Sequence, residues 1–299
     1  MTAECFLQNG IPAQADCPLS ELCSFHIGGR AGVAVFPRTR EELILALRTV
    51  LREGAPFDVA GNGTNLLFPD GVYPGVLIVT RRMREADFSG TEITASAGMP
   101  LPALAAEAMR RGLSGLEFAQ GIPGTVGGGV FMNAGAFGGC MADVTVWSEC
   151  FDTGTGEVLR FCGAEQCFGT RTSIYERNKR YILLGAGLHL TPGDPAAIAR
   201  KTEDCRTRRA RTQPLDLPSA GSVFRHPPGA FAGKLIEDCG LKGTRIGGAE
   251  VSTLHAGFIV NTGGATAADV EALIARIRET VLRRTGYRLE CEVRTLTYR

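Results

Sequence analysis

Hydrophobic residues recur along the chain with two different periods, which predicts a protein built from both helices and strands. Short apolar runs at 33–36 and 57–60 predict strands. Hydrophobic residues at helical spacing separate them, namely Leu43, Leu47, Val50 and Leu51. Thr39 and Glu42 have the spacing of a capping box before this helix, and Gly54 is suited to ending it. The segment is therefore predicted to be a β-α-β unit.

The same two patterns continue to the end of the chain. Strands are predicted at 76–80, 91–97, 144–151, 182–190, 256–261 and 289–297. Helices are predicted from Pro102 to Gly112, from Asp194 through the arginine-rich segment 206–211, at 232–239 and from Thr266 to Gly286. The composition changes after Pro214, where we expect a domain boundary. This mixture indicates the α+β fold class.

The most unusual stretch is 117–140, in which glycine stands at positions 121, 124, 127, 128 and 129. A backbone this rich in glycine can approach a ligand closely, and its N–H groups can converge on one point. Pro123 stiffens one turn, and Thr125 and Asn133 add small polar side chains. Such a segment suits a phosphate or a diphosphate. A glycine-rich buried turn, packed for space, is the alternative.

A second loop, 61–65, reads Gly-Asn-Gly-Thr-Asn and follows a predicted strand. Two such loops fit two ends of one large ligand, although an Asn-Gly hairpin turn is the simpler explanation of this one. Neither loop is a P-loop, because no Gly-Lys-Ser/Thr follows it. Neither has the Gly-x-Gly-x-x-Gly spacing of a Rossmann dinucleotide site. A dinucleotide bound here would therefore need another fold.

Composition and charge argue against several other classes of protein. The 299 residues are 44% hydrophobic and 21% charged, with a net charge of +1, so no overall field draws the protein to nucleic acid or to an anionic membrane. No apolar run reaches the roughly 18 residues of a membrane-spanning helix, and no signal peptide is evident. The ten cysteines have neither Cys-x-x-Cys nor zinc-site spacing, so we expect reduced thiols in the cytoplasm and no metal site.

Several motifs together resemble the UDP-N-acetylenolpyruvoylglucosamine reductase family, known as MurB. They are Gly-Asn-Gly-Thr-Asn-Leu-Leu from Gly61, Gly-Leu-Ser-Gly-Leu-Glu-Phe-Ala-Gln-Gly-Ile-Pro-Gly-Thr-Val-Gly-Gly from Gly112, and Asn-Ala-Gly from Asn133. Ser-Phe-His-Ile-Gly-Gly from Ser24 resembles the family's first segment, and its His26 fits a structural role better than a flavin contact. The resemblance runs nearly from end to end.

The resemblance implies an FAD-binding fold of the vanillyl-alcohol-oxidase or PCMH type. Two α+β subdomains are expected at 1–80 and 81–213, with a C-terminal α+β substrate-binding domain at 214–299 whose final strand returns to the active site. The cofactors implied are non-covalent FAD and NADPH as hydride donor. The short distance from Arg171 to Ser222 implies the shorter kind of family member, which lacks an inserted segment with a Tyr that closes over the nucleotide.

The FAD-binding residues implied by the resemblance lie in the two glycine-rich loops and just after them. They are Gly61, Asn62, Gly63, Thr64, Asn65, Gly121, Ile122, Pro123, Gly124, Thr125, Gly127, Gly128, Asn133, Ala134 and Gly135. In the family these loops wrap the diphosphate of FAD.

The family reduces UDP-N-acetylglucosamine enolpyruvate to UDP-N-acetylmuramate, a step of peptidoglycan precursor synthesis and so of cell wall biogenesis. Hydride passes from flavin N5 to the β-carbon of the enol ether. Negative charge then spreads from the α-carbon into the neighbouring carboxylate. Groups that bind this charge more tightly than they bind the substrate lower the barrier, and a positioned acid completes the reaction.

Three residues take these roles by resemblance. Arg171 would bind the substrate carboxylate, a protonated Glu292 would donate to the same oxygens, and Ser222 would deliver a proton to the α-carbon. The family's Tyr is replaced by Thr170 and its Pro by Cys291, so a substrate contact from that Tyr is in doubt. Taken from the residues alone, each of the three also has a structural explanation, as a surface Arg, a salt-bridged Glu and a capping Ser.

Arg225, His226 and His255 lie where the family places contacts to the UDP-sugar, and two lysines, Lys234 and Lys242, could neutralise its diphosphate or be solvated. We expect a monomer with no nucleic-acid or membrane partner. The alternative activity is another FAD-dependent oxidoreductase of the same fold, acting on a small hydroxy acid or alcohol. That alternative leaves Ala-Gly-Ser-Val-Phe around Ser222 unexplained. A non-catalytic nucleotide-binding module is the third hypothesis.

Overall fold

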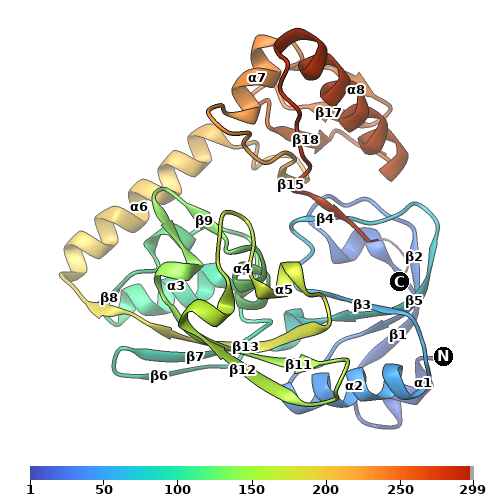
Figure 1. The fold of residues 1–299 in the computed structure, drawn as a ribbon, viewed down its shortest axis with the longest axis vertical. Coiled ribbons are helices and arrows are strands. Elements are labelled where there is room, and N and C mark those ends of the chain that lie inside the picture. Colours follow the sequence, from blue (N-terminus) through green and yellow to red (C-terminus); the bar gives the residue numbers. More distant parts are fainter. Residues whose placement is uncertain (297–299) are drawn as a thin grey trace. The chain divides into compact units, whose positions relative to one another are not determined.

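The computed structural model describes residues 1–296 and divides into two compact units (Figure 1). Unit 1 consists of residues 1–15, 33–62 and 75–209, and unit 2 of residues 16–32, 63–74 and the chain from 210 onward. Helices and strands occur in both units, which confirms the predicted α+β class. The boundaries predicted between residues 80 and 81 and between 213 and 214 stay predictions.

Unit 1 contains a five-stranded antiparallel sheet in the order β12-β11-β13-β7-β6. Its strands are β6 (Ala86–Ser89), β7 (Glu92–Ser96), β11 (Thr145–Asp152), β12 (Val158–Cys162) and β13 (Tyr181–His189). Figure 1 shows helices α3 (Leu101–Arg110), α4 (Val126–Met132) and α5 (Ile174–Arg177) together on one side of this sheet. The core on that side includes Leu104, Val130 and Ala186. Of these helices, α4 lies within the glycine-rich stretch 117–140.

The opposite face of the same sheet packs on α2 (Arg40–Arg52). Leu184 and Phe151 from the sheet join Leu43 and Leu47 from the helix in one buried core. Because successive side chains of a strand point to opposite faces, Leu184 faces α2 while its neighbour Leu183 faces the other core. The predicted β-α-β unit is confirmed, since α2 lies between β2 (Arg30–Val35) and β3 (Phe57–Ala60) in the chain.

A second sheet has the order β1-β2-β5-β3. Its outer strands are β1 (Ala13–Pro18) and β3, and β5 (Val72–Val79) pairs in parallel with β3 from Phe57 opposite Val76 to Ala60 opposite Val79. The smaller pairs are β8 (Leu113–Ser114) with β14 (Thr191–Pro192), and β9 (Gly135–Ala136) with β10 (Gly139–Cys140). Short helical turns are α1 (Glu4–Leu7), η1 (Leu19–Leu22), η2 (Thr80–Arg82), η3 (Glu117–Ala119), η4 (Met141–Asp143) and η5 (Gly163–Gln166).

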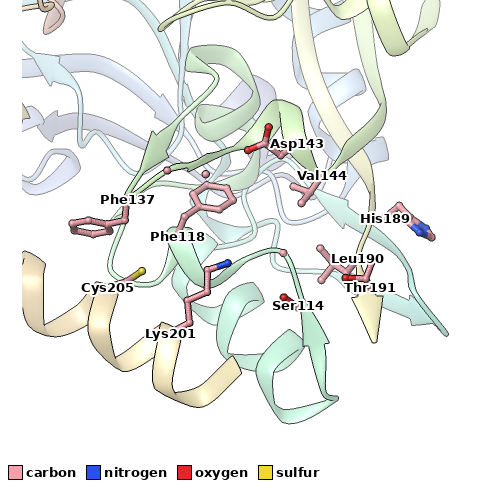
Figure 2. Close-up of a pocket in the computed structure, with 13 residues that line it drawn as sticks. Ser114, Phe118, Phe137, Asp143, Val144, His189, Leu190, Thr191, Lys201 and Cys205 are labelled. Atoms are coloured by element: carbon pink, nitrogen blue, oxygen red, sulfur yellow. The ribbon is translucent and has the colours of Figure 1, made fainter. Parts of the chain in front are cut away.

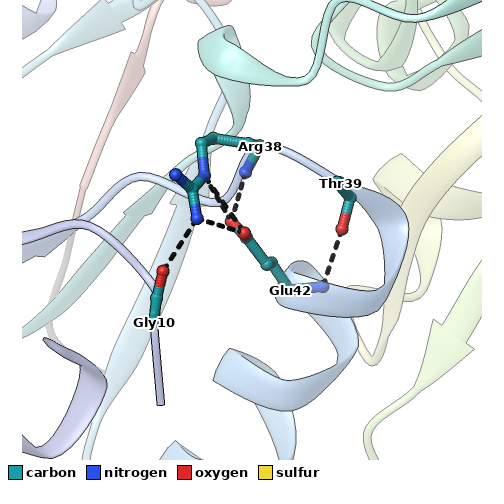
Figure 3. A network of polar contacts seen from close by, with 4 residues as sticks. All are labelled: Gly10, Arg38, Thr39 and Glu42. Atoms are coloured by element: carbon teal, nitrogen blue, oxygen red, sulfur yellow. Dashed lines mark hydrogen bonds and ion pairs between the residues drawn. The ribbon is translucent and has the colours of Figure 1, made fainter. Parts of the chain in front are cut away.

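The start of α2 differs in one detail from the expected capping box (Figure 3). Thr39 Oγ1 accepts a hydrogen bond from the backbone N–H of Glu42 at 3.2 Å, as expected. The Glu42 carboxylate, however, accepts from the backbone N–H of Arg38 at 2.8 Å and from its guanidinium at 2.7 Å. The same guanidinium donates to the carbonyl of Gly10 at 2.8 Å. The Glu42 carboxylate therefore binds Arg38, one residue before the N-cap, and not the N-cap itself. Through its bond to Gly10, Arg38 also connects the first turn of α2 to the N-terminal segment.

The long helix α6 (Pro195–Thr212) starts where its sequence predicts. Both oxygens of Asp194 accept backbone N–H groups of the first turn, from Ala196 at 3.2 Å and from Ala197 at 3.1 Å. Within residues 1–296, no helix combines the length and the apolar character needed to cross a membrane.

Unit 2 contains a four-stranded antiparallel sheet in the order β15-β18-β17-β16. Its strands are β15 (Ser219–Ser222), β16 (Arg245–Ile246), β17 (Ala249–Val251) and β18 (Phe258–Asn261), and its helices are α7 (Ala232–Asp238) and α8 (Ala267–Thr285). The predicted capping box of α8 is present, with Thr266 and Asp269 bonded to each other's backbone. Asp70 adds a second cap, because its carboxylate accepts the N–H groups of Ala267 at 2.6 Å and Ala268 at 3.0 Å.

The final predicted strand, 289–297, is wrong in extent. Only β19 (Arg294–Thr295) is a strand, paired in parallel with β4 (Leu66–Leu67), and residue 297 lies outside the described residues. The segment before β19 forms one isolated antiparallel bridge, between Cys291 and Phe224. The chain thus changes its pairing partner at Glu292, and a change of partner cannot be recognised from a hydrophobic pattern that reports only burial.

Candidate functional site

The first two residues of loop 61–65, Gly61 and Asn62, touch the glycine-rich stretch 117–140 within unit 1. Asn62 Nδ2 donates to the carbonyl of Pro123 at 2.8 Å. A Cβ atom on Gly61 would lie 2.5 Å from Thr125 Oγ1, so only glycine allows this approach of the two loops. The segments around Asn62 and Pro123 are therefore neighbours in unit 1, which the sequence alone left open.

The glycines at the start of α4 serve packing more than the sequence predicts. A Cβ on Gly127 would meet Ala97 at 2.9 Å, and one on Gly129 would meet Leu101 at 2.9 Å. The N–H of Gly127 donates to the carbonyl of Ala97 at 2.8 Å, and the N–H of Gly128 donates to Thr125 Oγ1 at 3.2 Å. Two of the N–H groups expected to converge on a phosphate are thus bonded inside the protein.

Other donors remain where the two loops meet. Among residues 1–296, the backbone N–H groups of Asn62, Gly124 and Thr125 make no hydrogen bond to another residue. Gln120 belongs to the same glycine-rich stretch as Gly124 and Thr125, and its buried Oε1 has no hydrogen-bond partner among residues 1–296. A buried acceptor without a donor costs about 1–3 kcal/mol. The three N–H groups therefore fit a bound group that accepts hydrogen bonds, as a diphosphate does, and the Gln120 oxygen fits a hydrogen-bond donor.

Gln120 was not among the residues predicted from the sequence, and neither was Arg209. Arg209 is only 9% exposed, and its Cδ lies 3.0 Å from the position that a Cβ on Gly121 would occupy. Its guanidinium stands 5.6 Å from the centre of the Phe137 ring, and burial lowers its pKa. Two other arginines of this segment form ion pairs with acidic residues of the same helix. Arg206 pairs with Glu203, and Arg208 pairs with Asp204. The arginine-rich run was the available signal, but its pattern does not show which member is buried.

Arg171 lies in a tight hairpin turn of unit 1. Gly169 and Thr172 exchange two backbone hydrogen bonds of 3.1 and 3.3 Å across the turn, with Thr170 and Arg171 between them. The φ angle of Arg171 is +55°, in the left-handed region that costs a residue with a side chain on the order of 1 kcal/mol. Its Nη2 donates to the carbonyl of Gly135 at 3.2 Å. Thr170, which replaces the family's Tyr, is exposed.

Ser222 and Glu292 belong to neighbouring backbone segments of unit 2. The N–H of Glu292 donates to the carbonyl of Val223, the residue after Ser222, at 2.7 Å. Asn65 of loop 61–65 donates from Nδ2 to the carbonyl of Glu292 at 3.1 Å, and its own carbonyl accepts from the N–H of Arg294 at 3.1 Å. The structure thus brings together two of the three predicted catalytic residues and one predicted cofactor-binding residue. Whether Arg171 of unit 1 meets the same ligand stays a prediction.

The predicted substrate-binding residues also lie in unit 2. His226 Nδ1 accepts from the N–H of Ala232 at 3.3 Å, and His255 Nδ1 accepts from the N–H of Gly257 at 3.0 Å. Since Nδ1 is an acceptor in both rings, we assign the proton of each neutral ring to Nε2, which leaves Nε2–H as a donor. Burial lowers the pKa of His255, which favours this neutral form. Arg225 is fixed through its backbone N–H, which donates to Glu290 at 2.9 Å.

The remaining candidates have local explanations. Lys234 pairs with Asp238 at 2.6 Å, and Lys242 pairs with Glu237 at 2.7 Å. His26 is exposed, with a left-handed φ of +53°. The ten cysteines are free thiols, and half of them are buried. None of these observations assigns a role in catalysis.

A separate cavity of about 380 Å³ in unit 1 contains none of the predicted site residues (Figure 2). Lys201 and Cys205 of α6 line it together with Phe118. The amine of Lys201 lies 3.4 Å from the buried carboxylate of Glu117. Burial raises the pKa of Glu117, but hydrogen bonds from Ser114 and the backbone and the charge of Lys201 outweigh it, so its pKa is lowered. The Lys201 ammonium group at the cavity therefore already forms an ion pair with the ionised Glu117 carboxylate.

Comparison with known proteins decides the family. A model of an FAD binding domain matches residues 31–161, and a model of the UDP-N-acetylenolpyruvoylglucosamine reductase C-terminal domain matches residues 213–296. The UDP-N-acetylenolpyruvoylglucosamine reductase of Moorella thermoacetica is 45% identical over 290 residues, which cover 96% of this chain and 95% of that protein. The chain belongs to the UDP-N-acetylenolpyruvoylglucosamine reductase family.

Other members agree with this assignment. The reductase of Alkaliphilus oremlandii is 45% identical over 280 residues, 93% of this chain and 91% of that protein. The crystal structure of the reductase (MurB) from Thermus caldophilus matches with a TM-score of 0.81 and 36% identity, over 96% of this chain and 99% of that one. The family resemblance inferred from the motifs is thereby confirmed, as is a fold that combines an FAD-binding domain with the family's C-terminal domain.

Proposed function

We propose that this protein reduces UDP-N-acetylglucosamine enolpyruvate to UDP-N-acetylmuramate, with FAD as bound cofactor and NADPH as hydride donor. The observation that carries the proposal is 45% identity to a reductase of this name along 96% of the chain. The matched family models, over residues 31–161 and 213–296, include both glycine-rich loops and the motifs with Ser222 and Glu292. The product is a precursor of peptidoglycan, so the proposed place of the enzyme is cell wall synthesis in the bacterial cytoplasm.

The residues that would hold FAD are those of the two loops in contact. The uncommitted N–H groups of Asn62, Gly124 and Thr125 suit the diphosphate, and Gln120 Oε1 suits a donor on the cofactor. Arg209 would add positive charge behind Gly121. We also propose that the other residues predicted to bind FAD, except Asn133, which is discussed below, contact the cofactor. Bound FAD would supply hydride transfer, from NADPH to the β-carbon of the enolpyruvyl group.

The chain's own residues would stabilise the charge that this transfer creates. The Arg171 guanidinium binds a carboxylate through two parallel N–H groups, and a protonated Glu292 adds a neutral donor to the same oxygens. Both interactions strengthen as negative charge grows on the substrate, which is the condition for catalysis rather than mere binding. Ser222 would give its proton to the α-carbon, a base strong enough to take a proton from a hydroxyl group.

The backbone pairing of Val223 with Glu292 supports these roles, because it keeps the segment that carries Ser222 next to the segment that carries Glu292. His226 and His255 would donate from Nε2, and Arg225 from its guanidinium, to the UDP-sugar. NADPH and the enol ether would use one site in turn, since neither glycine loop has a Rossmann signature. We further propose a monomer of the shorter kind, without the inserted Tyr segment.

The experiment that tests this function follows the colour of the purified protein. A flavoprotein should absorb near 450 nm, about where flavins absorb as a class. Anaerobic NADPH should bleach it, and UDP-N-acetylglucosamine enolpyruvate should then restore the colour. Bleaching without recovery would mean a flavin reductase with another acceptor. A colourless protein that binds no added FAD would overturn the assignment of both loops.

A further inference from the structure

Arg171 is attached to the C-terminal end of the glycine-rich helix α4 by three hydrogen bonds. Ser173 Oγ donates to the carbonyl of Phe131 at 2.7 Å, and Asn133 Nδ2 donates to the carbonyl of Gly169 at 3.0 Å. The third is the bond from Arg171 itself to Gly135. Segment 131–135 and segment 169–173 are thus joined on both sides of the Arg171 turn, and all three bonds lie inside unit 1.

Asn133 occupies the centre of this connection. It ends α4 in the left-handed region, with φ +43° and ψ +55°, and its side chain is 8% exposed. While Nδ2 donates to Gly169, Oδ1 accepts from the N–H of Ala142 at 2.9 Å. Both ends of the amide are therefore used between parts of the protein, although the sequence predicts that Asn133 contacts the cofactor.

The choice of asparagine at this position follows from these two bonds. Glycine would adopt the same backbone conformation at least as easily, so the left-handed cap alone does not require asparagine. Aspartate would keep the oxygen for Ala142 but would place a second oxygen against the carbonyl of Gly169. Of these three residues, only asparagine offers a donor to Gly169 and an acceptor to Ala142 together.

We propose that Asn133 is a positioning residue, which acts by fixing the Arg171 turn to the end of α4 rather than by binding FAD. The Arg171 backbone is in an unfavourable conformation, and a residue there relaxes unless its surroundings hold it. The turn has only Thr170 and Arg171 between its two paired residues, so losing the Gly169 anchor moves the guanidinium directly. This inference rests on the proposed function, in which Arg171 acts on the substrate carboxylate.

The proposal separates the two half-reactions. Reduction of the flavin by NADPH creates no charge on the enol ether carboxylate, whereas re-oxidation by the enol ether requires Arg171 to bind that carboxylate. Asn133→Gly keeps the backbone conformation and removes both side-chain bonds. We expect it to slow re-oxidation by 10- to 100-fold in anaerobic stopped-flow measurements. Flavin reduction and the dissociation constant of FAD should stay within about threefold of the parent protein.

Two further variants make the test specific. Asn133→Asp keeps the acceptor for Ala142 and the left-handed cap, and it should slow re-oxidation at least as much. Asn178→Gly removes another asparagine helix cap of unit 1, whose Oδ1 accepts from the N–H of Arg180 at 3.3 Å, and it should leave both half-reactions within twofold. For Asn133→Gly, Asn133→Asp and Asn178→Gly alike, the far-UV circular dichroism spectrum and a cooperative thermal unfolding transition should show that the variant is folded.

A double-mutant cycle shows whether Asn133 acts through Arg171. In an Arg171→Ala background, Asn133→Gly should change re-oxidation by less than twofold, because the group that it positions is already absent. A full 10- to 100-fold loss in that background would overturn the proposal. A tenfold weaker FAD affinity, with both half-reactions slowed alike, would instead show that Asn133 holds the cofactor. Absence of re-oxidation in the parent protein would reject the proposed function and not this inference.

Discussion

The two units position their predicted catalytic residues by different means. In unit 1, Arg171 depends on side-chain hydrogen bonds, from Asn133 and Ser173, and on a turn with an unfavourable φ. In unit 2, Ser222 and Glu292 depend on main-chain pairing, through the bond from Glu292 N–H to the Val223 carbonyl. A main-chain bond tolerates most side-chain changes, whereas a side-chain bond is lost with one substitution. The geometry of Arg171 should therefore be the more fragile of the two.

The largest effect is expected for Ser222→Ala, which tests the predicted proton donor of unit 2. Without the proton donor, re-oxidation of the flavin by the enol ether should fall by roughly 100- to 10,000-fold. Reduction by NADPH should be nearly unchanged. Ser219→Ala in the same strand is the matched control, because Ser219 bonds to Ser24 through its backbone and the variant keeps those bonds. Equal losses in both variants would show damage to β15 rather than loss of a proton donor.

A second effect concerns the stability of unit 1. The Asp152 carboxylate, 1% exposed, is held by the Arg180 guanidinium across β11 and β13, and hydrogen bonding to Arg180 lowers the pKa of Asp152 to about 2. A lowered carboxyl pKa stabilises the folded state above the unfolded value near 4, and this contribution disappears as pH falls through 2. Asp152→Asn should therefore cost about 2 kcal/mol at pH 7 and about half as much at pH 3.

The measurement is denaturant unfolding at pH 7 and pH 3, followed by fluorescence of Trp147. This residue lies on β11 and is the only tryptophan of the sequence, so its signal reports unit 1. A cost that is equal at both pH values would mean that Asp152 contributes by packing and not by its charge.

A smaller effect is expected for Ser173→Ala. The Ser173 hydroxyl donates to Phe131 and accepts from the N–H of Tyr175 at 3.2 Å, so its loss should cost about 1–2 kcal/mol of unit 1 stability. Because Asn133 still holds the turn, re-oxidation should slow less than in Asn133→Gly. If Ser173→Ala slowed re-oxidation more than the loss of Asn133, the turn would be anchored mainly from its other side.

The smallest effect is expected for Cys291→Pro, which restores the family's residue beside Glu292. The paired segments bond through the N–H groups of Arg225 and Glu292, and no hydrogen bond from the N–H of Cys291 occurs among residues 1–296. Proline therefore removes no bond, and stability and both half-reactions should change little, by within about 0.5 kcal/mol. A large loss would mean that the backbone of unit 2 is less tolerant than its pairing suggests, and the contrast between the units would fail.

Local signals in the sequence were enough for most elements of the fold. The extent of β3, the cap at Thr266 and the starts of α2 and α6 were predicted from periodicity and capping patterns, because residues close in the sequence carry these signals. The motifs that carry the predicted catalytic residues were recognisable for a similar reason, because the residue types themselves carry the resemblance. The expected strand 289–297 failed because its bonds are shared between two partners far apart in the chain.

Only the tertiary structure decided what each polar group of the loops does. The sequence shows only that Gly61 is flexible and that Thr125 and Asn133 are small and polar. These properties are equally suited to binding a ligand and to packing inside the protein. The fold places Thr125 against Gly61, uses both ends of the Asn133 amide inside unit 1, and leaves Gln120 Oε1 buried without a partner among residues 1–296. A hydrogen bond between residues distant in the chain depends on positions set by the whole core, and a local pattern carries no record of them.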